Sequence, residues 1–373
     1  MKNIIVLILF SVIGASSYWV YNRYRLNSSS PIPFPYVFHK DTYDGIKSED
    51  APIVIIGDRI GDRLARLIDY MSSRISQDLS KNVKIISLAE KGEGLHRTLR
   101  KIQKLGKLPL ITIYLGGSEE TFEKRFYSKD IKTINKNFKR YNDDRIKTLL
   151  MIFPSLSPFI YEPINYKKLT SKIVKDDTNY TDNTIQKRNM VHFKLFEEEL
   201  HQLFSYIKEK GSYLFAISQP LNYDSPPKKV CNGSTDDLID NELSKSLALI
   251  KKKDFKKAYG LTKNLTLLAN SNAEIFYIHA KVAESLGYTK ESIKYFEMSM
   301  ALDCSQWRGN PVYNKILSRT AKKNEVLIFD FNKLLLANRN INITFEDDVY
   351  PQNLYVEKMI DILSARIKKL LKL

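Results

Sequence analysis

The sequence predicts an α/β protein built on a parallel sheet. Short runs rich in β-branched residues recur along the chain, and amphipathic stretches with helical spacing lie between them. Strands that alternate with helices form βαβ units, whose strands lie parallel in one sheet. The clearest unit runs from Pro52 to Met71, where Ile53-Val54-Ile55-Ile56 precede a turn at Gly57-Asp58-Arg59 and then a helix. Because a turn of this kind lies at the carboxyl end of its strand, it is where ligands and catalytic groups collect in α/β sheets.

Five apolar runs are predicted as strands, at 52–56, 83–88, 108–115, 213–218 and 326–331. Helices are predicted after the first strand with Leu64, Leu67, Ile68 and Met71 on one face, at 95–105, at 185–210, between 308 and 319, and around Val356, Met359, Ile360 and Leu363. The segment 121–184 is poorly periodic. Its apolar loop 151–160 packs on its own domain, forms a lid or makes a second membrane contact.

Residues 4–21 form an apolar run of 18 residues that ends in tyrosine and tryptophan. This length and these aromatic residues predict a membrane anchor in segment 1–25. The alternative is a signal peptide cleaved near Ala15 and Ser17. Segment 26–50 begins with serines and prolines and is predicted to be an extended tether.

Composition limits the classes of partner and cofactor. The net charge is +17, but the lysines and arginines are spread along the chain without a nucleic-acid-binding motif. We therefore interpret the charge as a solvated basic surface and predict no nucleic-acid partner. Cys231 and Cys304 lack the spacing of metal ligands, so no metal and no cofactor is expected. Whether these two cysteines pair is left open.

An internal repeat lies between the fourth and fifth predicted strands. The segments 253–258 and 287–292 align with Ala258 and Ser292 separated by 34 residues, the tetratricopeptide period. The second copy also has Ala280, Gly287, Phe296 and Leu302 at the offsets needed for packing between two helices. Because two repeats are too few for independent stability, we predict a tetratricopeptide-like helical insertion at 228–307 that leans on the rest of the chain. The α/β domain then consists of 51–227 and 308–373.

Four blocks of this chain together resemble the SGNH, or GDSL, hydrolases. Gly57-Asp58-Arg59 resembles the Gly-Asp-Ser block, with Arg59 in place of the serine nucleophile. A glycine after the second strand, Gly94 or Gly92, matches an oxyanion-hole donor. Ser118 stands where the family has an oxyanion-hole Asn, and Glu119 matches the acidic residue that follows that Asn. Asp347 matches the Asp of the final Asp-x-x-His block, with Tyr350 in place of the histidine. The resemblance implies a flavodoxin-like three-layer fold with ester hydrolysis or acyl transfer as its chemistry, and a subgroup carries repeats between the fourth and fifth strands.

The substitutions remove the groups that this chemistry needs. Arg59 has no acceptor lone pair and stays protonated, so it is no nucleophile. Tyr350, with an ordinary pKa near 10, is a poor general base. Gly57, Asp58 and Asp347 remain, so the pocket is expected to persist without the reaction. In it, Arg59 either forms an internal salt bridge beside Asp58 and Asp347 or presents a cation to an anionic ligand.

Three functions follow as hypotheses. The first is a pseudoenzyme tethered to the cytoplasmic membrane through residues 4–21, with its globular part outside the cytoplasm. It would bind a partner protein through the helical insertion, or an envelope polysaccharide. The second is a divergent esterase or O-acyltransferase with a relocated nucleophile, for which Ser118 is the candidate. The third is a basic scaffold on anionic lipid that faces the cytoplasm.

Overall fold

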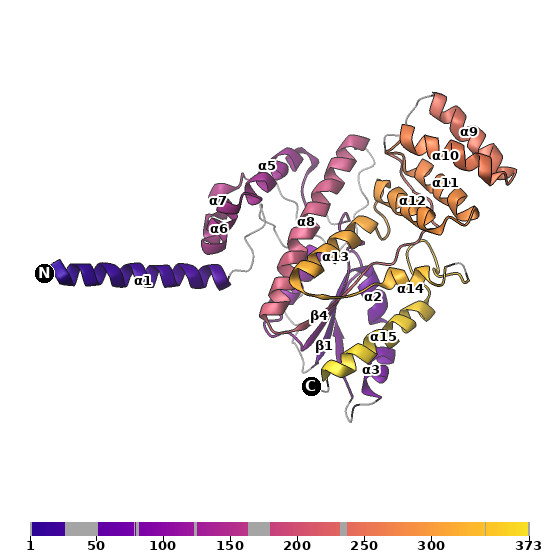
Figure 1. Ribbon diagram of the computed structural model, residues 1–373. Helices are drawn as coiled ribbons and strands as arrows, with labels where there is room; N and C mark the ends of the chain where they lie inside the picture. The colour runs from indigo at the N-terminus through magenta and orange to yellow at the C-terminus, as the bar shows by residue number, and fades with distance from the viewer. Residues whose placement is uncertain are drawn as a thin grey trace.

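A computed structural model describes residues 2–26, 51–77, 79, 82–122, 125–162, 180–231, 237–339 and 341–371. Within these residues, five parallel strands form one sheet in the order β2-β1-β3-β4-β5 (Figure 1). The strands are β1 (Ile53–Gly57), β2 (Ile85–Ser87), β3 (Ile111–Leu115), β4 (Tyr213–Ile217) and β5 (Leu327–Phe329). This order is that of flavodoxin-like sheets, and it confirms the predicted α/β class with a parallel sheet.

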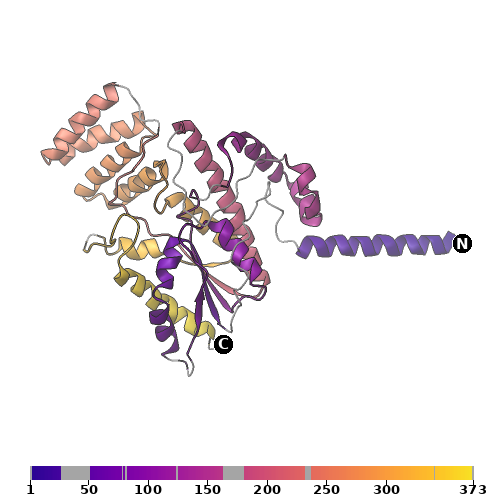
Figure 2. The ribbon, with the colours of Figure 1, turned by 180° about the vertical axis from the view of Figure 1, so that it is seen from behind.

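Helices cover both faces of the sheet, so the molecule has three layers. One face packs against α2 (Arg59–Ala65), α3 (Ile68–Ser76), α14 (Phe331–Leu336) and α15 (Asn353–Leu371). The other face packs against α4 (Leu95–Lys104), α8 (Asp182–Glu209) and α13 (Pro311–Asn324). Figures 1 and 2 show the strands between these two groups of helices. Side chains of β1 point alternately to the two faces of the sheet. Ile53 and Ile55 pack in the core with α2, α3, α14 and α15, and Val54 and Ile56 pack in the core with α4, α8 and α13.

The first helix of the prediction is divided in two. Helix α2 ends at Ala65 and α3 begins at Ile68, although the sequence predicts a single helix over Leu64 and Met71. Leu64 and Met71 are fully buried, while Leu67 and Ile68 are only partly buried between them. The apolar spacing therefore identified the buried face but not the break in the backbone.

Within the poorly periodic segment, the described residues 125–162 are largely helical. It contains η1 (Ser128–Asp130), α5 (Ile131–Tyr141), α6 (Asp144–Ile152), η2 (Pro154–Leu156) and α7 (Ser157–Ile160). The two prolines that suggested a loop at 151–160 stand in the first turns of η2 and α7, where a missing N–H costs nothing. The prediction of an apolar loop was wrong for this reason.

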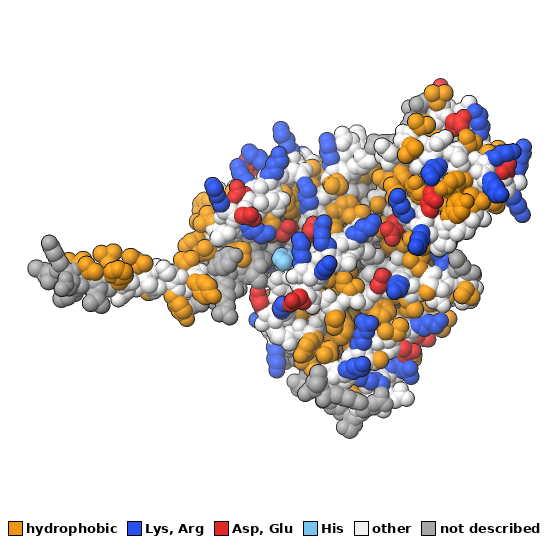
Figure 3. Space-filling view, in the orientation of Figure 1, with side chains coloured by type: hydrophobic (Ala, Val, Ile, Leu, Met, Phe, Trp, Pro, Cys, Tyr) orange, Lys and Arg blue, Asp and Glu red, His pale blue; other side chains and the backbone are white. Residues whose placement is uncertain are grey.

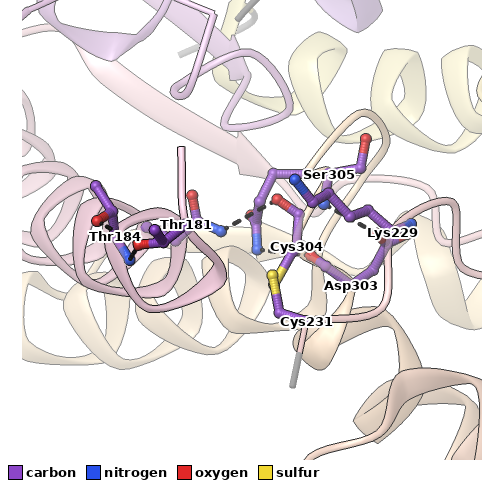
Figure 4. The surroundings of a disulfide bond; sticks show 9 residues. Thr181, Thr184, Lys229, Cys231, Asp303, Cys304 and Ser305 are labelled. Carbon is purple, nitrogen blue, oxygen red and sulfur yellow. Dashed lines mark hydrogen bonds between the residues drawn. A yellow bond between two sulfur atoms is a disulfide. The ribbon is translucent and has the colours of Figure 1, made fainter. Parts of the chain in front are cut away.

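Among the described residues, four helices are inserted between β4 and α13, the helix that leads into β5. They are α9 (Asp237–Lys251), α10 (Phe255–Leu268), α11 (Ala273–Ser285) and α12 (Thr289–Leu302), and they lie side by side in Figure 1. A disulfide joins Cys231 and Cys304 at the two ends of this insertion, with 6.0 Å between the Cα atoms (Figure 4). The structure thus settles the pairing that the sequence left open.

The predicted membrane segment forms helix α1 (Lys2–Leu26). Among the side chains that the structure describes, no helix offers a stretch long and apolar enough to cross a membrane, so the predicted spanning anchor lacks support in the structure. Near its end, α1 contacts α6, with the rings of Trp19 and Phe153 5.7 Å apart. The predicted tether lies outside the described residues except for Leu26.

Candidate functional site

The turn between β1 and α2 places Asp58 at the carboxyl edge of the sheet. Gly57 precedes it with φ of +140°, and a Cβ atom there would lie 1.9 Å from the carbonyl oxygen of Leu115. Only glycine fits this close approach of β1 to the end of β3. The Asp58 carboxylate caps α2 by accepting the Ile60 N–H at 3.0 Å. Its other oxygen accepts from the backbone N–H and the hydroxyl of Ser118, at 2.6 and 2.8 Å.

Arg59 forms a buried ion pair with Glu119. Its Nε lies 2.7 Å from one carboxylate oxygen of Glu119, and its backbone N–H donates to the other at 3.3 Å. The Phe122 ring centroid lies 5.0 Å from the guanidinium carbon, and a terminal nitrogen donates to the Trp307 carbonyl at 3.5 Å. The sequence suggested Asp58 and Asp347 as neighbours for an internal salt bridge. The ion pair joins Arg59 to Glu119 instead, across the ends of β1 and β3.

The glycines after β2 have different roles from each other. The backbone N–H of Gly92 donates to the same Glu119 carboxylate that pairs with Arg59. Gly94 is the N-cap residue of α4, and its carbonyl accepts from Thr98. In the first turn of that helix, the Leu95 N–H donates to Glu120 at 2.8 Å. Glu119 and Glu120 therefore both use backbone donors that follow β2.

The buried carboxyl groups of Asp58 and Glu119 both have raised pKa values in this site. Burial is the main cause that raises the pKa of Glu119 to about 7, and the nearby Asp58 raises it further, against the opposing effects of Arg59 and the Gly92 N–H. Burial also raises the pKa of Asp58, although hydrogen bonds from Ile60 and Ser118 lower it. Near neutral pH the site therefore favours one bound proton on the pair of carboxyl groups, Asp58 and Glu119.

The last predicted block lies on the loop before α15. Asp347 is exposed, and its carboxylate accepts the N–H groups of Val349 and Tyr350 at 2.7 and 2.6 Å. Burial raises the pKa of Tyr350, and the charges of Arg59 and Glu119 act on it with opposite signs. Asp347 thus shapes its own loop, while Tyr350 lies within electrostatic reach of the Arg59–Glu119 pair.

A hollow of about 500 Å³ adjoins Asp347. Its lining includes Asn222 and Asp224 after β4 and the segment 341–345 before Asp347. Asn222 donates to the Asp347 carbonyl at 3.1 Å, so the wall is tied to the loop of the predicted last block. Arg339 closes one side of it through an ion pair with Asp224 at 2.9 Å. This hollow is open to a ligand, while the donors around Glu119 are already occupied.

The histidines that the structure describes are engaged elsewhere. His96 bonds to Glu199 at 2.9 Å, and burial lowers the pKa of His96 to about 4. His201 lies 3.1 Å from the Asn324 amide, and His279 lies 2.8 Å from the Thr262 hydroxyl. The ring of His192 is tilted against that of Phe126, with the ring centroids 5.1 Å apart. None of these contacts includes Asp58 or Asp347, so no histidine described here takes the part of a triad base.

The six predicted site residues thus lie around one sheet edge, and Glu119 joins them; they are Asp58, Arg59, Gly94, Ser118, Asp347 and Tyr350. The structure brings Asp58, Arg59 and Ser118 together, while Gly94 has a capping role in α4 and Asp347 is turned toward its own loop. The sequence named Glu119 only as the acidic residue after Ser118. The signal for its role was the arginine at position 59, because a buried arginine requires a buried acid.

No protein-family model matches the chain, and no curated protein matches it. Among solved structures, the chain is similar to the lipase/acylhydrolase from Enterococcus faecalis, with 12% identity, 86% of this chain and 96% of that chain covered, and a TM-score of 0.36. It is also similar to LAE5, an alpha/beta hydrolase enzyme from the metagenome of Lake Arreo, with 9% identity, 87% of this chain and 97% of that chain covered, and a TM-score of 0.38. A third similar structure is a GDSL-like lipase from Bacteroides thetaiotaomicron, with 9% identity, 87% of this chain and 91% of that chain covered, and a TM-score of 0.35. At such scores these likenesses say nothing of the chemistry of this chain.

Proposed function

We propose that this chain is an SGNH hydrolase-like pseudoenzyme that binds a partner or an envelope polymer without turnover. The observation that carries the proposal is the occupation of the site by its own residues. The Glu119 carboxylate takes the Arg59 guanidinium and the Gly92 N–H, which would otherwise face an incoming acyl oxygen. Arg59 stands where a nucleophile is needed, and Tyr350 stands where a base is needed.

The helical insertion is the proposed protein-binding surface. Helices α10 and α12 begin 34 residues apart, and Ala258 and Ser292 are buried at the fourth position of each. This equivalence supports a tetratricopeptide-like pair, a fold that presents helices to peptide partners. The hollow beside Asp347 is the proposed site for an envelope polysaccharide, since its lining mixes amide, carboxylate and apolar side chains.

We further propose that α1 tethers the protein to lipid, with the globular part outside the cytoplasm. The apolar run 4–21 supports the tether, and the usual work of the resembled family on envelope polymers supports the side. A C-terminal reporter that is active only after export should be active in cells. Activity of a cytoplasm-dependent reporter alone would contradict the placement.

One observation favours the second candidate, a divergent esterase or O-acyltransferase. The Ser118 hydroxyl donates to Asp58 at 2.8 Å, so a serine and a carboxylate are in direct contact at the edge where this chemistry occurs. A carboxylate with a raised pKa is a better base than an ordinary one. None of the contacts given above for the four described histidines reaches this pair.

The deciding experiment labels the purified chain with a serine-reactive phosphonate and assays hydrolysis of aryl and acetyl-sugar esters. The pseudoenzyme should show neither labelling nor turnover above background. Arg59→Ser alone should not restore activity, because no base is present, whereas Arg59→Ser with Tyr350→His and Ser118→Asn should recover at most a trace. Turnover that Ser118→Ala abolishes would establish the second candidate. Turnover that survives Ser118→Ala would show that the active site lies elsewhere.

A further inference from the structure

Exposed apolar side chains gather at the tip of the molecule, which we define as residues 149–159 of α6, η2 and α7. Phe159 is 86% exposed, and Leu149, Phe153 and Leu156 are also exposed. Figure 3 shows apolar side chains along α1 and on the neighbouring part of the body that carries α6 and α7. Exposed aromatic and aliphatic groups in one place mark an interaction surface.

Helix α1 shows what covers this surface. No charged residue occurs from Ile4 to Tyr21, so this part of the helix is predominantly apolar, and its described aliphatic side chains from Ile5 to Ile13 are exposed. Such a helix requires an apolar environment, and lipid supplies one. Its aromatic residues Tyr18, Trp19 and Tyr21 have the amphipathic rings that favour the headgroup level of a bilayer. Trp19 is also the residue that contacts Phe153, so the tip stands at that same level.

Basic residues lie on α6 and on the neighbouring helix α5, where Lys136 is paired with Glu162. Arg145 and Lys147 lie in the first turns of α6, on the helix that carries Leu149. Along α5, Lys132, Lys136 and Lys139 recur at one-turn intervals and line a hollow of about 670 Å³. Cations beside exposed apolar groups match the anionic headgroups and the acyl chains of a phospholipid surface.

We propose that the tip is a second lipid contact, in which Phe159 and its apolar neighbours enter the headgroup region of an anionic bilayer beside α1. This inference rests on the proposed tether, since α1 brings the tip to the lipid. With two contacts instead of one, the body is held in a fixed orientation on the membrane, and the sheet edge that carries Asp58 keeps a constant height above it.

The experiment places a fluorescent label that responds to polarity at single cysteines in the full chain. Cys231 and Cys304 are joined in a disulfide and do not react under non-reducing conditions. The variants are Phe159→Cys in the tip, Phe10→Cys in α1, and Leu267→Cys in α10 as a control with similar exposure away from α1. Each is reconstituted into vesicles of phosphatidylglycerol with phosphatidylethanolamine, or of phosphatidylcholine, that contain a nitroxide-labelled lipid.

The label at position 159 should shift to shorter wavelength and be quenched at least twofold by nitroxide lipid, while the label at 267 should not change. Quenching at 159 should be greater with phosphatidylglycerol than with phosphatidylcholine. Quenching at 10 without quenching at 159 would overturn this inference and leave the tether intact. Loss of quenching at both positions would overturn the tether as well. A shifted label at 159 that nitroxide lipid does not quench would show that protein rather than lipid shields the tip, and would overturn the lipid contact.

Discussion

Glu119 determines what the sheet edge is able to do. Its carboxylate holds the Arg59 side chain and the Gly92 N–H, so groups from three different strand ends meet on one acid. Arginine is long enough to reach from the end of β1 to the end of β3, whereas serine at the same position is not. Arg59 therefore links the turn after β1 to the end of β3, on the same acid that binds the turn after β2.

The raised pKa of Glu119 predicts a dependence of stability on pH. A carboxyl with a pKa of about 7 in the folded chain and about 4.5 in the unfolded chain binds its proton more tightly when folded. The free energy of unfolding should therefore fall as pH rises from about 4.5 to 7, by up to about 3 kcal/mol. Urea denaturation across this range should show the fall in the natural chain and a much smaller one in Glu119→Gln. Parallel pH profiles for the two proteins would contradict the assignment.

Gly57 and Gly260 offer a matched test of backbone strain. Gly57→Ala puts a methyl group against the Leu115 carbonyl at a positive φ and should destabilise the fold by about 3 kcal/mol. Gly260, inside α10, has nothing within 4 Å of the added carbon, so Gly260→Ala should stabilise by about 0.5 to 1 kcal/mol. Denaturant midpoints measure both. Equal effects of the two substitutions would show that the close approach of β1 to β3 is absent.

At the scale of elements, the disulfide should make a large contribution to stability. Cys231 and Cys304 are 73 residues apart, and closing a loop of that length in the unfolded chain is worth about 4 kcal/mol. Cys231→Ser with Cys304→Ser should lower the melting temperature measured by calorimetry, and reduction of the natural chain should lower it by the same amount. A reduced natural chain that melts like the oxidised one would exclude a stabilising bridge.

The two helix pairs of the insertion should respond alike to overpacking. Ala258 and Ser292 are buried at the same position of α10 and α12. Ala258→Leu and Ser292→Leu should each cost about 1 to 3 kcal/mol, because extra methyl groups force neighbouring helices apart. Ala248→Leu, at an exposed position of α9, should stay within about 0.5 kcal/mol of the natural chain. Thermal melts followed by circular dichroism test the three variants, and a neutral Ser292→Leu would contradict the equivalence of the pairs.

For the whole molecule, the spacing of hydrophobic residues in the sequence predicts the sheet and its covering helices better than it predicts the contacts of the candidate site. Runs such as 53–56 identify buried strands because a parallel sheet is covered on both faces, and Val356 and Met359 identify α15 by helical spacing. Pattern did not predict the break between α2 and α3, which leaves the buried face unchanged. It also did not predict that Arg59 pairs with Glu119, since that contact joins residues 60 positions apart through the register of β1 and β3.

The adjacent ends of the insertion have a consequence for how such a protein changes over time. Because the chain leaves the body at Cys231 and returns at Cys304, 6.0 Å away, the four helices are attached at one place on the fold. A segment attached in this way is free to vary in length, or to be exchanged for another, without altering the order of the strands. The helical insertion is therefore able to evolve separately from the sheet and the helices that carry it.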